Sequence, residues 1–356
     1  MKIKTLTSCF FLAFAISSCI QDEALNSEAA IDGCTGADVQ LANINANEKI
    51  VDVYVHKGAD LAKQELKFTL PEGATIKPNN SRDGDTGNFY NFSEAGNSRS
   101  FTVTSENGEF KPTYTINIKP TELPTVYHFE DLLIAENTPY HILYEFAPST
   151  SQGISKVLQW SSGNPGFALT GMAKSPTDYP TVQVESGFNK KCVKLETKDT
   201  GSFGAMVKMY IAAGNLFIGD YKTNAQSPKD SPKFGRSFTG ARPTGLKGWY
   251  KYTSKPVDYV GNPDNLKNDE CHIYLRLWDD KDNEIGYGEF IGKETVTQYT
   301  QFRFDVTYTN KTAKPAKITI VATSSHYGGD FTGMKVTGSV GVGSELWVDE
   351  FELLYE

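Results

Sequence analysis

The sequence predicts an all-β protein with two folded units, an immunoglobulin-like sandwich followed by a larger β-sandwich. Short runs of alternating polar and apolar residues recur between clusters of glycine, proline, asparagine and aspartate, as in strands joined by tight turns. No stretch has the length and apolar period of an amphipathic helix. The 356 residues include 21 Phe, 18 Tyr, 31 Gly and 16 Pro, which suits a turn-rich globular β-protein of two or three domains.

The charge balance narrows the function classes. The chain has 43 acidic and 35 basic side chains and a formal net charge of −8, which argues against a nucleic-acid partner because such proteins need a basic surface. The one long apolar run lies at the very start of the sequence, so a polytopic membrane protein is also excluded.

The first 18 residues have the features of a lipoprotein signal peptide. Lys2 and Lys4 precede a short apolar run, and the small residues Ser17 and Ser18 stand directly before Cys19. This arrangement resembles a bacterial lipobox, in which the cysteine is lipidated and becomes the first residue of the mature protein. The alternative is a plain secretory peptide that is cleaved elsewhere.

Residues 19–32 are polar and without apolar periodicity, so we expect a flexible tether. Asp22 and Glu23 behind the lipidated cysteine resemble the surface-export signal of Bacteroidetes lipoproteins. That resemblance implies an outer-membrane protein whose only membrane contact is its lipid anchor and which faces the cell exterior. If the acidic residues are an ordinary solvated linker, the protein faces the periplasm.

Residues 33–120 form the first predicted unit. Alternating runs at 49–58, 64–78, 99–110 and 112–120 are separated by turn residues, and Asn107-Gly108 predicts a hairpin before the last run. Several short strands over this length favour an immunoglobulin-like sandwich. Its ending resembles the final hairpin of small Ig-like modules in Bacteroidetes surface proteins, which usually act as stalks. Pro120 and Pro124 predict a short linker, because proline disfavours both helix and interior strand.

Residues 125–356 form the second unit, long for a single β-sandwich but acceptable. Its strand candidates are 126–133, 181–187, 191–198, 245–253, 271–279, 300–308, 316–325 and 344–355.

Six segments of this unit follow one another in a characteristic order: AGNLFIGDY (213–221), FGRSFTGARPTGLKGWYKYT (234–253), IYLRLWD (273–279), GYGEF (286–290), ITIVATSSHYGGDFTG (318–333) and GSELWVDEFELLYE (343–356). The chain thereby resembles the putative carbohydrate metabolism domain family of Bacteroidetes lipoproteins, which joins an Ig-like module to a jelly-roll domain. The resemblance covers about two-thirds of the chain. It implies a jelly roll like those of carbohydrate-binding modules, and it leaves catalysis open.

The first and last strands of a jelly roll lie close together, and both carry acidic residues here. The first contains Phe129-Glu130-Asp131 and the last contains Asp349 beside Trp347. Many calcium-binding carbohydrate modules have a similar opening and ending, in which the early Glu and the late Asp bind one structural Ca²⁺. On that analogy Glu130 and Asp349 are candidate calcium ligands, since Ca²⁺ prefers carboxylate and carbonyl oxygens. Alternatively, these acids are solvent-side positions of alternating strands.

Aromatic residues near strand ends are the candidate glycan contacts, because sugar rings present apolar faces that stack on aromatic side chains. Trp278 precedes Asp279 and Asp280 at a predicted strand end, Tyr287 lies between glycines, and Tyr327 lies in a loop. We expect these five residues to bind ligand, with the aromatics stacking and the carboxylates binding hydroxyls.

Trp249 and Trp347 lie within predicted strands, and we expect them to be harder for a ligand to reach. The alternative for each aromatic residue is that it packs in the core or at its rim.

The sequence has few features that indicate catalysis, disulfide bonds or a cysteine zinc site. The sequence has no GxSxG, HExxH or phosphate-binding loop. Glu289 with Asp279 or Asp280 is a conceivable glycosidase pair, but no spacing distinguishes it. Cys192 and Cys271 lie in strand-like runs, where buried thiols are favoured over a disulfide, and the spacing of the cysteines matches no zinc site.

These features favour a cell-surface lipoprotein that binds a glycan through its jelly roll, held out on an Ig-like stalk, for polysaccharide capture or utilisation. We expect a polysaccharide ligand, neighbouring surface glycan-uptake proteins as partners, and no cofactor other than the calcium ion. The alternatives are a glycoside hydrolase or related carbohydrate-active enzyme, and a structural or adhesive subunit that assembles by strand exchange.

Overall fold

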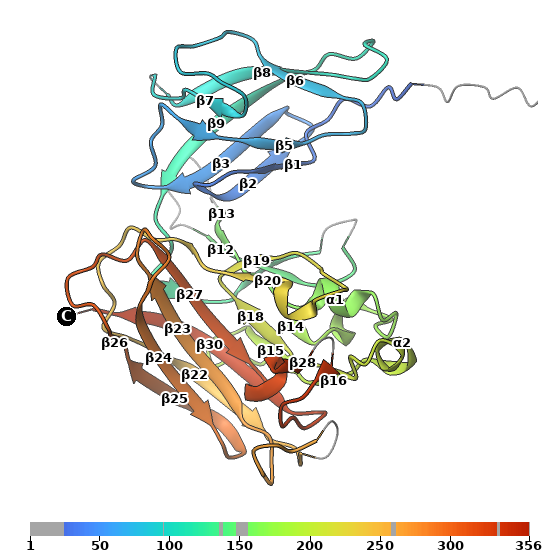
Figure 1. Cartoon of the computed structure of the whole chain (residues 1–356), viewed down its shortest axis with the longest axis vertical. Helices are drawn as coiled ribbons and strands as arrows, with labels where there is room; N and C mark the ends of the chain where they lie inside the picture. The colour runs from blue at the N-terminus through green and yellow to red at the C-terminus, as the bar shows by residue number, and fades with distance from the viewer. Residues whose placement is uncertain are drawn as a thin grey trace, which may run out of the picture.

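The computed structural model describes residues 25–94, 96–134, 138–146, 156–257, 261–332 and 335–355. The predicted signal peptide, Cys19 and residues 20–24 of the predicted tether lie outside these residues. The prediction that the tether is flexible up to residue 32 is wrong, because Ile31 is 2% exposed in the core of the N-terminal module and the Asp32 N–H donates to the Thr69 backbone oxygen. The fold is all-β, with a smaller N-terminal module and a larger β-sandwich, as the sequence predicts (Figure 1). Among the described residues, no helix is long and apolar enough to cross a membrane.

The N-terminal module is an immunoglobulin-like sandwich. Its main sheet has the strand order β2-β3-β9-β8-β6, with β3 and β9 parallel, and β1 pairs β5 while β4 pairs β7. Its core contains Val53, Phe101, Tyr114 and Ile116, all fully buried. The strands are β1 (Gly33–Thr35), β2 (Val39–Asn45), β3 (Ile50–His56), β4 (Gln64–Glu65), β5 (Lys67–Thr69), β6 (Thr75–Pro78), β7 (Phe89–Tyr90), β8 (Ser98–Thr104) and β9 (Thr113–Thr121).

The predicted hairpin joins β8 to β9, and Gly108 has the positive φ of 73° that favours glycine at this turn. The predicted start of the linker is wrong by two residues, because β9 continues through Pro120 to Thr121. β8 pairs β9 only up to Asn117, so the end of β9 has one free edge, where a residue without an N–H is tolerated.

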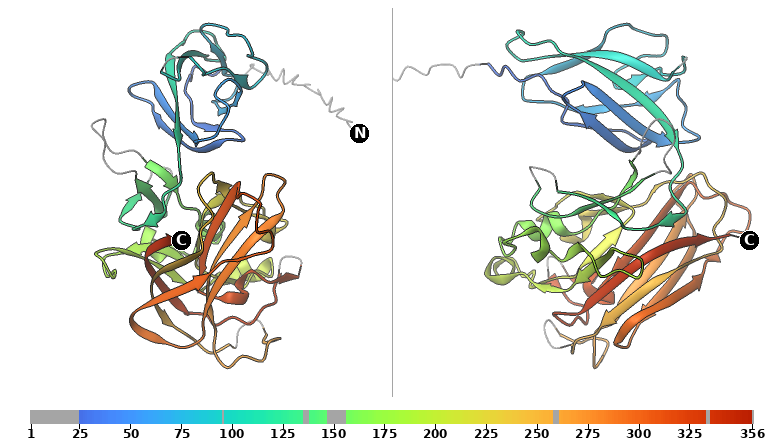
Figure 2. Two further views of the ribbon diagram at one scale, coloured as in Figure 1. Left: turned by 90° about the vertical axis from the view of Figure 1, so that its left-hand side faces the viewer. Right: turned by 180° about the vertical axis from the view of Figure 1, so that it is seen from behind.

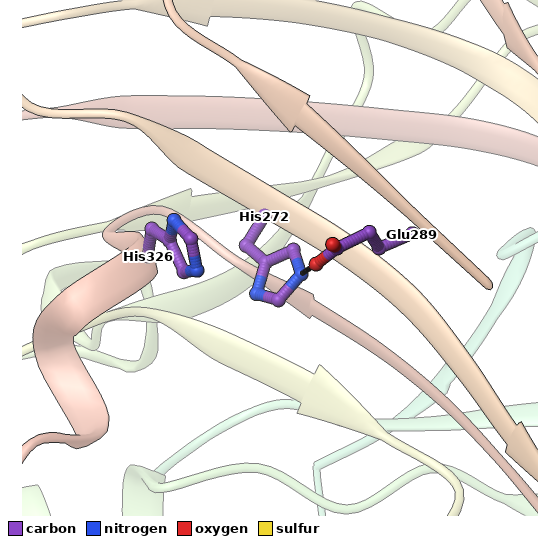
Figure 3. A group of neighbouring side chains, drawn as sticks. All are labelled: His272, Glu289 and His326. Atoms are coloured by element: carbon purple, nitrogen blue, oxygen red, sulfur yellow. Dashed lines mark hydrogen bonds and ion pairs between the residues drawn. The ribbon is translucent and has the colours of Figure 1, made fainter. Parts of the chain in front are cut away.

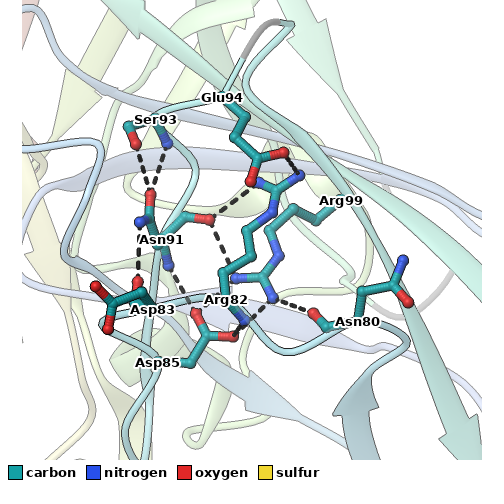
Figure 4. Close-up of polar contacts among 8 residues, drawn as sticks. All are labelled: Asn80, Arg82, Asp83, Asp85, Asn91, Ser93, Glu94 and Arg99. Atoms are coloured by element: carbon teal, nitrogen blue, oxygen red, sulfur yellow. Dashed lines mark hydrogen bonds and ion pairs between the residues drawn. The ribbon is translucent and has the colours of Figure 1, made fainter.

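A buried ion pair fastens the loop between β6 and β8 to the sheet (Figure 4). The Arg99 guanidinium donates to both carboxylate oxygens of Asp85 at 2.7 Å, and to the backbone oxygens of Asn80 and Asn91. The side chains of Arg99 and Asp85 are only 3% and 10% exposed. The backbone N–H groups of Arg82 and Asn91 also donate to Asp85, so this one carboxylate organises the loop.

The larger domain is a sandwich of two six-stranded antiparallel sheets. One has the order β14-β15-β30-β22-β25 with β10 beside β30, and the other has the order β18-β27-β23-β24-β26 with β21 beside β27. We call them the β30 sheet and the β23 sheet. Their strands are β10 (Val126–Tyr127), β14 (Thr181–Val184), β15 (Cys192–Glu196), β18 (Asn215–Phe217), β21 (Arg236–Ser237), β22 (Gly245–Thr253), β23 (Cys271–Trp278), β24 (Glu284–Gly292), β25 (Val296–Asp305), β26 (Thr307–Tyr308), β27 (Lys317–Thr323) and β30 (Glu345–Leu354).

Smaller elements complete this domain. The helical segments are short, since α1 and α2 have five and six residues. The remaining elements are β11 (Asp131–Leu133), β12 (Ile142–Phe146), β13 (Lys156–Gln159), α1 (Asn164–Ala168), η1 (Pro176–Asp178), β16 (Lys198–Asp199), α2 (Gly201–Met206), β17 (Ile211–Ala212), β19 (Gly219–Tyr221), η2 (Pro228–Asp230), β20 (Pro232–Phe234), η3 (His326–Gly329), β28 (Phe331–Thr332) and β29 (Lys335–Val336).

The first and last strands of the domain meet, as expected for a jelly roll. The predicted first strand over 126–133 is wrong in extent, because β10 ends at Tyr127 and β11 pairs with β12 in another sheet, so Glu130 lies between the two strands. Tyr127 of β10 pairs with Phe351 of β30, and the Phe129 ring contacts the Phe351 ring edge-on. The core between the two sheets includes Leu275 and Ile320 from one side and Leu346 from the other. Side chains that alternate with these core residues lie on the two outer faces.

The two modules touch at a small apolar cluster. Leu41 and Tyr54 of the N-terminal module pack with Tyr144 of β12, and the Gln40 side chain donates to the Ser237 backbone oxygen at 3.0 Å. Figure 2 shows the chain passing from the N-terminal module into the larger domain.

Candidate functional site

The outer face of the β23 sheet holds a row of aromatic and polar side chains. Ile273, Leu275 and Leu277 of β23 are fully buried in the core. Because side chains alternate along a strand, the residues between them point to the outer face. These residues are His272, Tyr274, Arg276 and Trp278, and the outer face on which they lie is called the β23 face below.

β24 adds two further residues to the β23 face. Tyr287 pairs with Arg276 and Glu289 pairs with Tyr274, and residues directly opposite in a ladder share a face. The Arg276 guanidinium lies 5.3 Å from the centre of the Tyr287 ring. The Tyr287 hydroxyl donates to the Glu289 carboxylate at 2.7 Å. Arginine, tyrosine and carboxylate groups therefore form one continuous polar and aromatic surface.

A histidine–glutamate cluster lies at one end of this row (Figure 3). His272 Nε2 is 2.8 Å from Glu289 Oε2, and η3 places His326 so that its ring centre is 4.2 Å from that of His272. One ligand atom from each of the three residues lies within 4.8 Å of the other two. The side chain of His272 is 9% exposed and that of Glu289 is 41% exposed, so the cluster lies at the protein surface with one buried member.

Burial and neighbouring groups shift the pKa values of His272 and Glu289. Burial, together with the charge of His326, lowers the pKa of His272 to about 4. Burial alone acts to raise the pKa of Glu289, but the hydrogen bonds from Tyr287 and His272 outweigh it, and the pKa is lowered. At neutral pH the pair is therefore a neutral imidazole beside an ionised carboxylate.

The three predicted aromatic contacts lie along this face rather than at one point. Tyr327 stacks on His326, with ring centres 4.3 Å apart, at the cluster end. Tyr287 lies in the middle, and Trp278 lies at the far end of β23 beneath the Lys317 ammonium. Six residues of strand, roughly 20 Å, separate Trp278 from His272. An extended ligand could contact all three aromatic residues, whereas a single sugar ring could not.

The two predicted acidic contacts lie in the turn after β23. Asp279 accepts the backbone N–H groups of Lys281 and Asn283, both at 2.9 Å, so its carboxylate stabilises the turn. Asp280 is exposed beside it. The conceivable pair of Glu289 with either aspartate is wrong, because Glu289 lies opposite Tyr274, roughly 17 Å along β23 from Asp279. Glycosidase carboxylates lie within about 10 Å of each other.

The outer face of the β30 sheet also carries exposed aromatic residues. Phe188 stacks on Trp249 with ring centres 3.8 Å apart, beside a shallow depression of about 350 Å³ that Lys247 and Gln301 help to line. Trp249 and Trp347 are partly exposed on this face rather than in the core. Phe188 already covers one ring face of Trp249.

Glu130 and Asp349, the predicted calcium ligands, contact the same loop. The Lys191 N–H donates to Glu130 at 3.2 Å, and the Asn189 N–H donates to Asp349 at 2.9 Å. Asp349 is fully buried, and burial raises its pKa to about 6. The Glu350 N–H donates to the other oxygen of Asp349 at 2.9 Å, so backbone hydrogen bonds already offset part of the cost of burying this carboxylate. Calcium binding by Glu130 and Asp349 stays a prediction.

Cys34, Cys192 and Cys271, the cysteines that the structure describes, are free and buried. Burial raises the pKa of Cys192 to about 11, which disfavours the nucleophilic thiolate form.

Comparison with known proteins assigns the chain to a family. Residues 128–354 match the model described as "Putative carbohydrate metabolism domain", and residues 34–118 match the model described as "SGBP, N-terminal". The chain belongs to the putative carbohydrate metabolism domain family. The sequence resemblance is thereby confirmed, and the function of the protein is carbohydrate-related.

Two crystal structures resemble the chain along most of their own length. One, described as a putative glycoside hydrolase from Bacteroides thetaiotaomicron, is 32% identical, covers 94% of this chain and 99% of its own, and has a TM-score of 0.66. The other, described as a putative glycoside hydrolase from Bacteroides vulgatus, is 30% identical, covers 66% of this chain and 99% of its own, and has a TM-score of 0.56. A search of the curated proteins finds no match.

Sequence reasoning missed the cluster at the end of the β23 face. From the sequence, Glu289 is considered only with Asp279 or Asp280, and His272 within its strand is not distinguished from a packing residue. Two features of the sequence pointed to this cluster: the alternation of β23, which puts His272 on the outer face, and the His326-Tyr327 pair after β27. Only the strand register joins them.

Proposed function

We propose that this protein binds a glycan chain along the β23 face. The observation that carries the proposal is the continuous row of half-buried aromatic residues with charged groups among them, from Tyr327 through Tyr287 to Trp278. Aromatic rings accept the apolar faces of sugars, while Arg276 and Glu289 offer a donor and an acceptor for hydroxyl groups. The N-terminal match to a glycan-binding protein family supports the same interpretation.

The ligand class that fits is an oligosaccharide or polysaccharide. The row extends roughly 20 Å, which is longer than one sugar ring, and it lies on an open sheet face. The strands beneath hold the side chains in fixed positions, so binding requires little ordering of the protein. In this proposal, lipidation at Cys19 anchors the protein in the outer membrane with the glycan-binding domain facing the cell exterior, next to other glycan-uptake proteins. The lipobox and the acidic tether support this part.

The test is a screen of the mature protein against plant and host polysaccharides, followed by calorimetry with each hit. We expect Tyr287→Ala to weaken binding by on the order of tenfold or more, because it removes a central stacking surface. Trp249→Ala on the opposite outer face is the matched control and should leave the affinity unchanged. Equal losses in both variants, or no binding by the folded protein across a broad panel, would refute the proposal.

The second candidate is a glycoside hydrolase, which the description of the two related structures favours. The same polysaccharides, incubated with the protein and assayed for new reducing ends, decide between the two. Release of sugar that Glu289→Gln abolishes would assign catalysis to this face. Binding without release supports the glycan-binding role.

A further inference from the structure

The cluster at the end of the β23 face has the composition of a transition-metal site. His272, Glu289 and His326 bring two imidazoles and one carboxylate together from three separate elements, β23, β24 and η3. Two histidines with one glutamate are a donor set that zinc sites use when they retain an open position.

We propose that His272, Glu289 and His326 bind one divalent transition-metal ion of the zinc class. Metal–ligand bonds of about 2.0–2.2 Å place tetrahedral ligand atoms roughly 3.3 Å apart. His272 Nε2 and Glu289 Oε2 are 2.8 Å apart and hydrogen-bonded, and one ligand atom from each of the three residues lies within 4.8 Å of the other two. For Nε2 to bind a metal, its proton moves to Nδ1, and metal–ligand bonds replace this hydrogen bond.

The surroundings orient each ligand as metal sites require. The Tyr287 hydroxyl donates to Glu289 at 2.7 Å, which fixes the carboxylate. His326 Nδ1 is buried without a hydrogen-bond partner and lies 3.8 Å from Glu270 Oε2. A proton on Nδ1 facing that carboxylate leaves Nε2 free to bind a metal. His272 is held by the strand itself, with a side chain that is 9% exposed.

The same argument selects the kind of ion. Imidazole nitrogen favours zinc, copper, nickel and iron over calcium and magnesium, which prefer oxygen. Glu289 is 41% exposed, so a bound ion retains solvent-facing positions filled by water. The site is therefore distinct in its donors from the Glu130 and Asp349 pair, and it does not depend on glycan binding.

The experiment is calorimetric titration of the mature protein with zinc chloride, after treatment with a chelator and dialysis and with no polyhistidine tag. We expect one ion per chain. His326→Gln and Glu289→Gln should each abolish saturable binding, and Tyr287→Phe should weaken it by about 10-fold or more, the size of effect seen for groups that orient metal ligands.

His128→Gln is the matched control. His128 Nδ1 lies 2.8 Å from Glu350 Oε2, so the two residues form a similar histidine–glutamate pair. Among the described residues, however, no third ligating side chain joins this pair to complete a metal-binding group. This variant should bind zinc as the wild type does. The His326 side chain is partly exposed on η3, so its replacement tests the site even if a change at His272 prevents folding.

Two results would overturn the proposal. One is a folded wild-type protein that binds no zinc at millimolar concentration. The other is binding that survives both His326→Gln and Glu289→Gln. Zinc binding by a protein that binds no polysaccharide would refute the proposed function and leave this site standing, so the two failures are distinguishable.

Discussion

Replacing Asp85 is expected to destabilise the N-terminal module selectively. Asp85 is the sole carboxylate that the Arg99 guanidinium contacts within the described residues, and Arg99 is 3% exposed. In Asp85→Ala the guanidinium stays buried beside the rings of Phe92 and Phe101 without a counter-charge. Two backbone N–H groups of the loop lose their acceptor as well.

The size of the effect follows from this geometry. Breaking a buried ion pair by removing one partner costs about 3–5 kcal/mol, since an uncompensated charge remains. A module of this length is stable by roughly 5–10 kcal/mol, so the variant loses a large part of its stability. At about 4–8 °C for each kcal/mol, the melting temperature of the module should fall by on the order of 20 °C.

Tryptophan fluorescence follows the unfolding of the larger domain separately from that of the N-terminal module. The protein's four tryptophans, Trp160, Trp249, Trp278 and Trp347, all belong to the larger domain. Calorimetry of the variant should therefore show one transition moved to lower temperature, while the transition followed by tryptophan fluorescence stays in place. Asp83→Ala is the control, because Asp83 is exposed in the same loop and contributes its backbone oxygen to Asn91.

The pH dependence of the module's stability has a definite sign. The Arg99 hydrogen bonds hold the pKa of Asp85 well below its ordinary value of 3.8, against the opposing effect of burial. A carboxyl group with a lowered pKa in the folded state stabilises it above the unfolded pKa, and that stability is lost as the pH falls below about 4. Wild type should therefore lose stability in the module on acidification, and Asp85→Ala should lose less. Equal melting of wild type, Asp85→Ala and Asp83→Ala would refute the reasoning.

Two further predictions concern the larger domain. If Glu130 and Asp349 share a calcium ion, excess calcium should raise the melting temperature over that in chelator by about 5 °C in wild type and not in Asp349→Asn; identical wild-type curves in both conditions would eliminate the site. Burial raises the pKa of Glu145 to about 7, although the N–H groups of His128 and Phe129 and the Trp160 indole donate to it. Since the folded state then holds a proton that the unfolded chain releases, stability should fall as the pH rises from 4.5 to about 7. Glu145→Gln should flatten this slope in urea titrations followed by fluorescence, and an unchanged slope would contradict it.

Local pattern was sufficient for most strands. The run 245–253 is β22 as observed, and the run 271–279 exceeds β23 by one residue. Both strands alternate between buried and outward residues, which is the property that periodicity detects. β24 was missed as a strand because Gly286, Gly288 and Gly292 interrupt its pattern. Gly286, Gly288 and Gly292 lie against the side chains of Tyr308, Phe304 and Cys271, respectively. A Cβ at any of these glycines would come within 3 Å of the neighbouring side chain.

The site was harder to predict than the strands because its residues are joined by register. His272 and Glu289 are 17 residues apart and meet only because β23 and β24 pair with Tyr274 opposite Glu289. A shift of one residue would turn Glu289 to the other face of the sheet. His326 arrives from beyond β27, which pairs with β23 on its other side. No short motif encodes such a contact, so composition and spacing cannot reveal it.

The two candidate ion sites lie on opposite sheets of one sandwich, and this arrangement makes their roles separable. Asp349 belongs to β30 and contacts the loop after β14, whereas His272 and Glu289 belong to the β23 sheet. Oxygen donors on one sheet and nitrogen donors on the other select different ions. If each site binds its ion, Asp349→Asn should abolish only the calcium response and His326→Gln only the zinc response. A glycan bound along the β23 face would contact the zinc-site residues directly. It would not contact the calcium-site residues, because the hydrophobic core separates the two sheets.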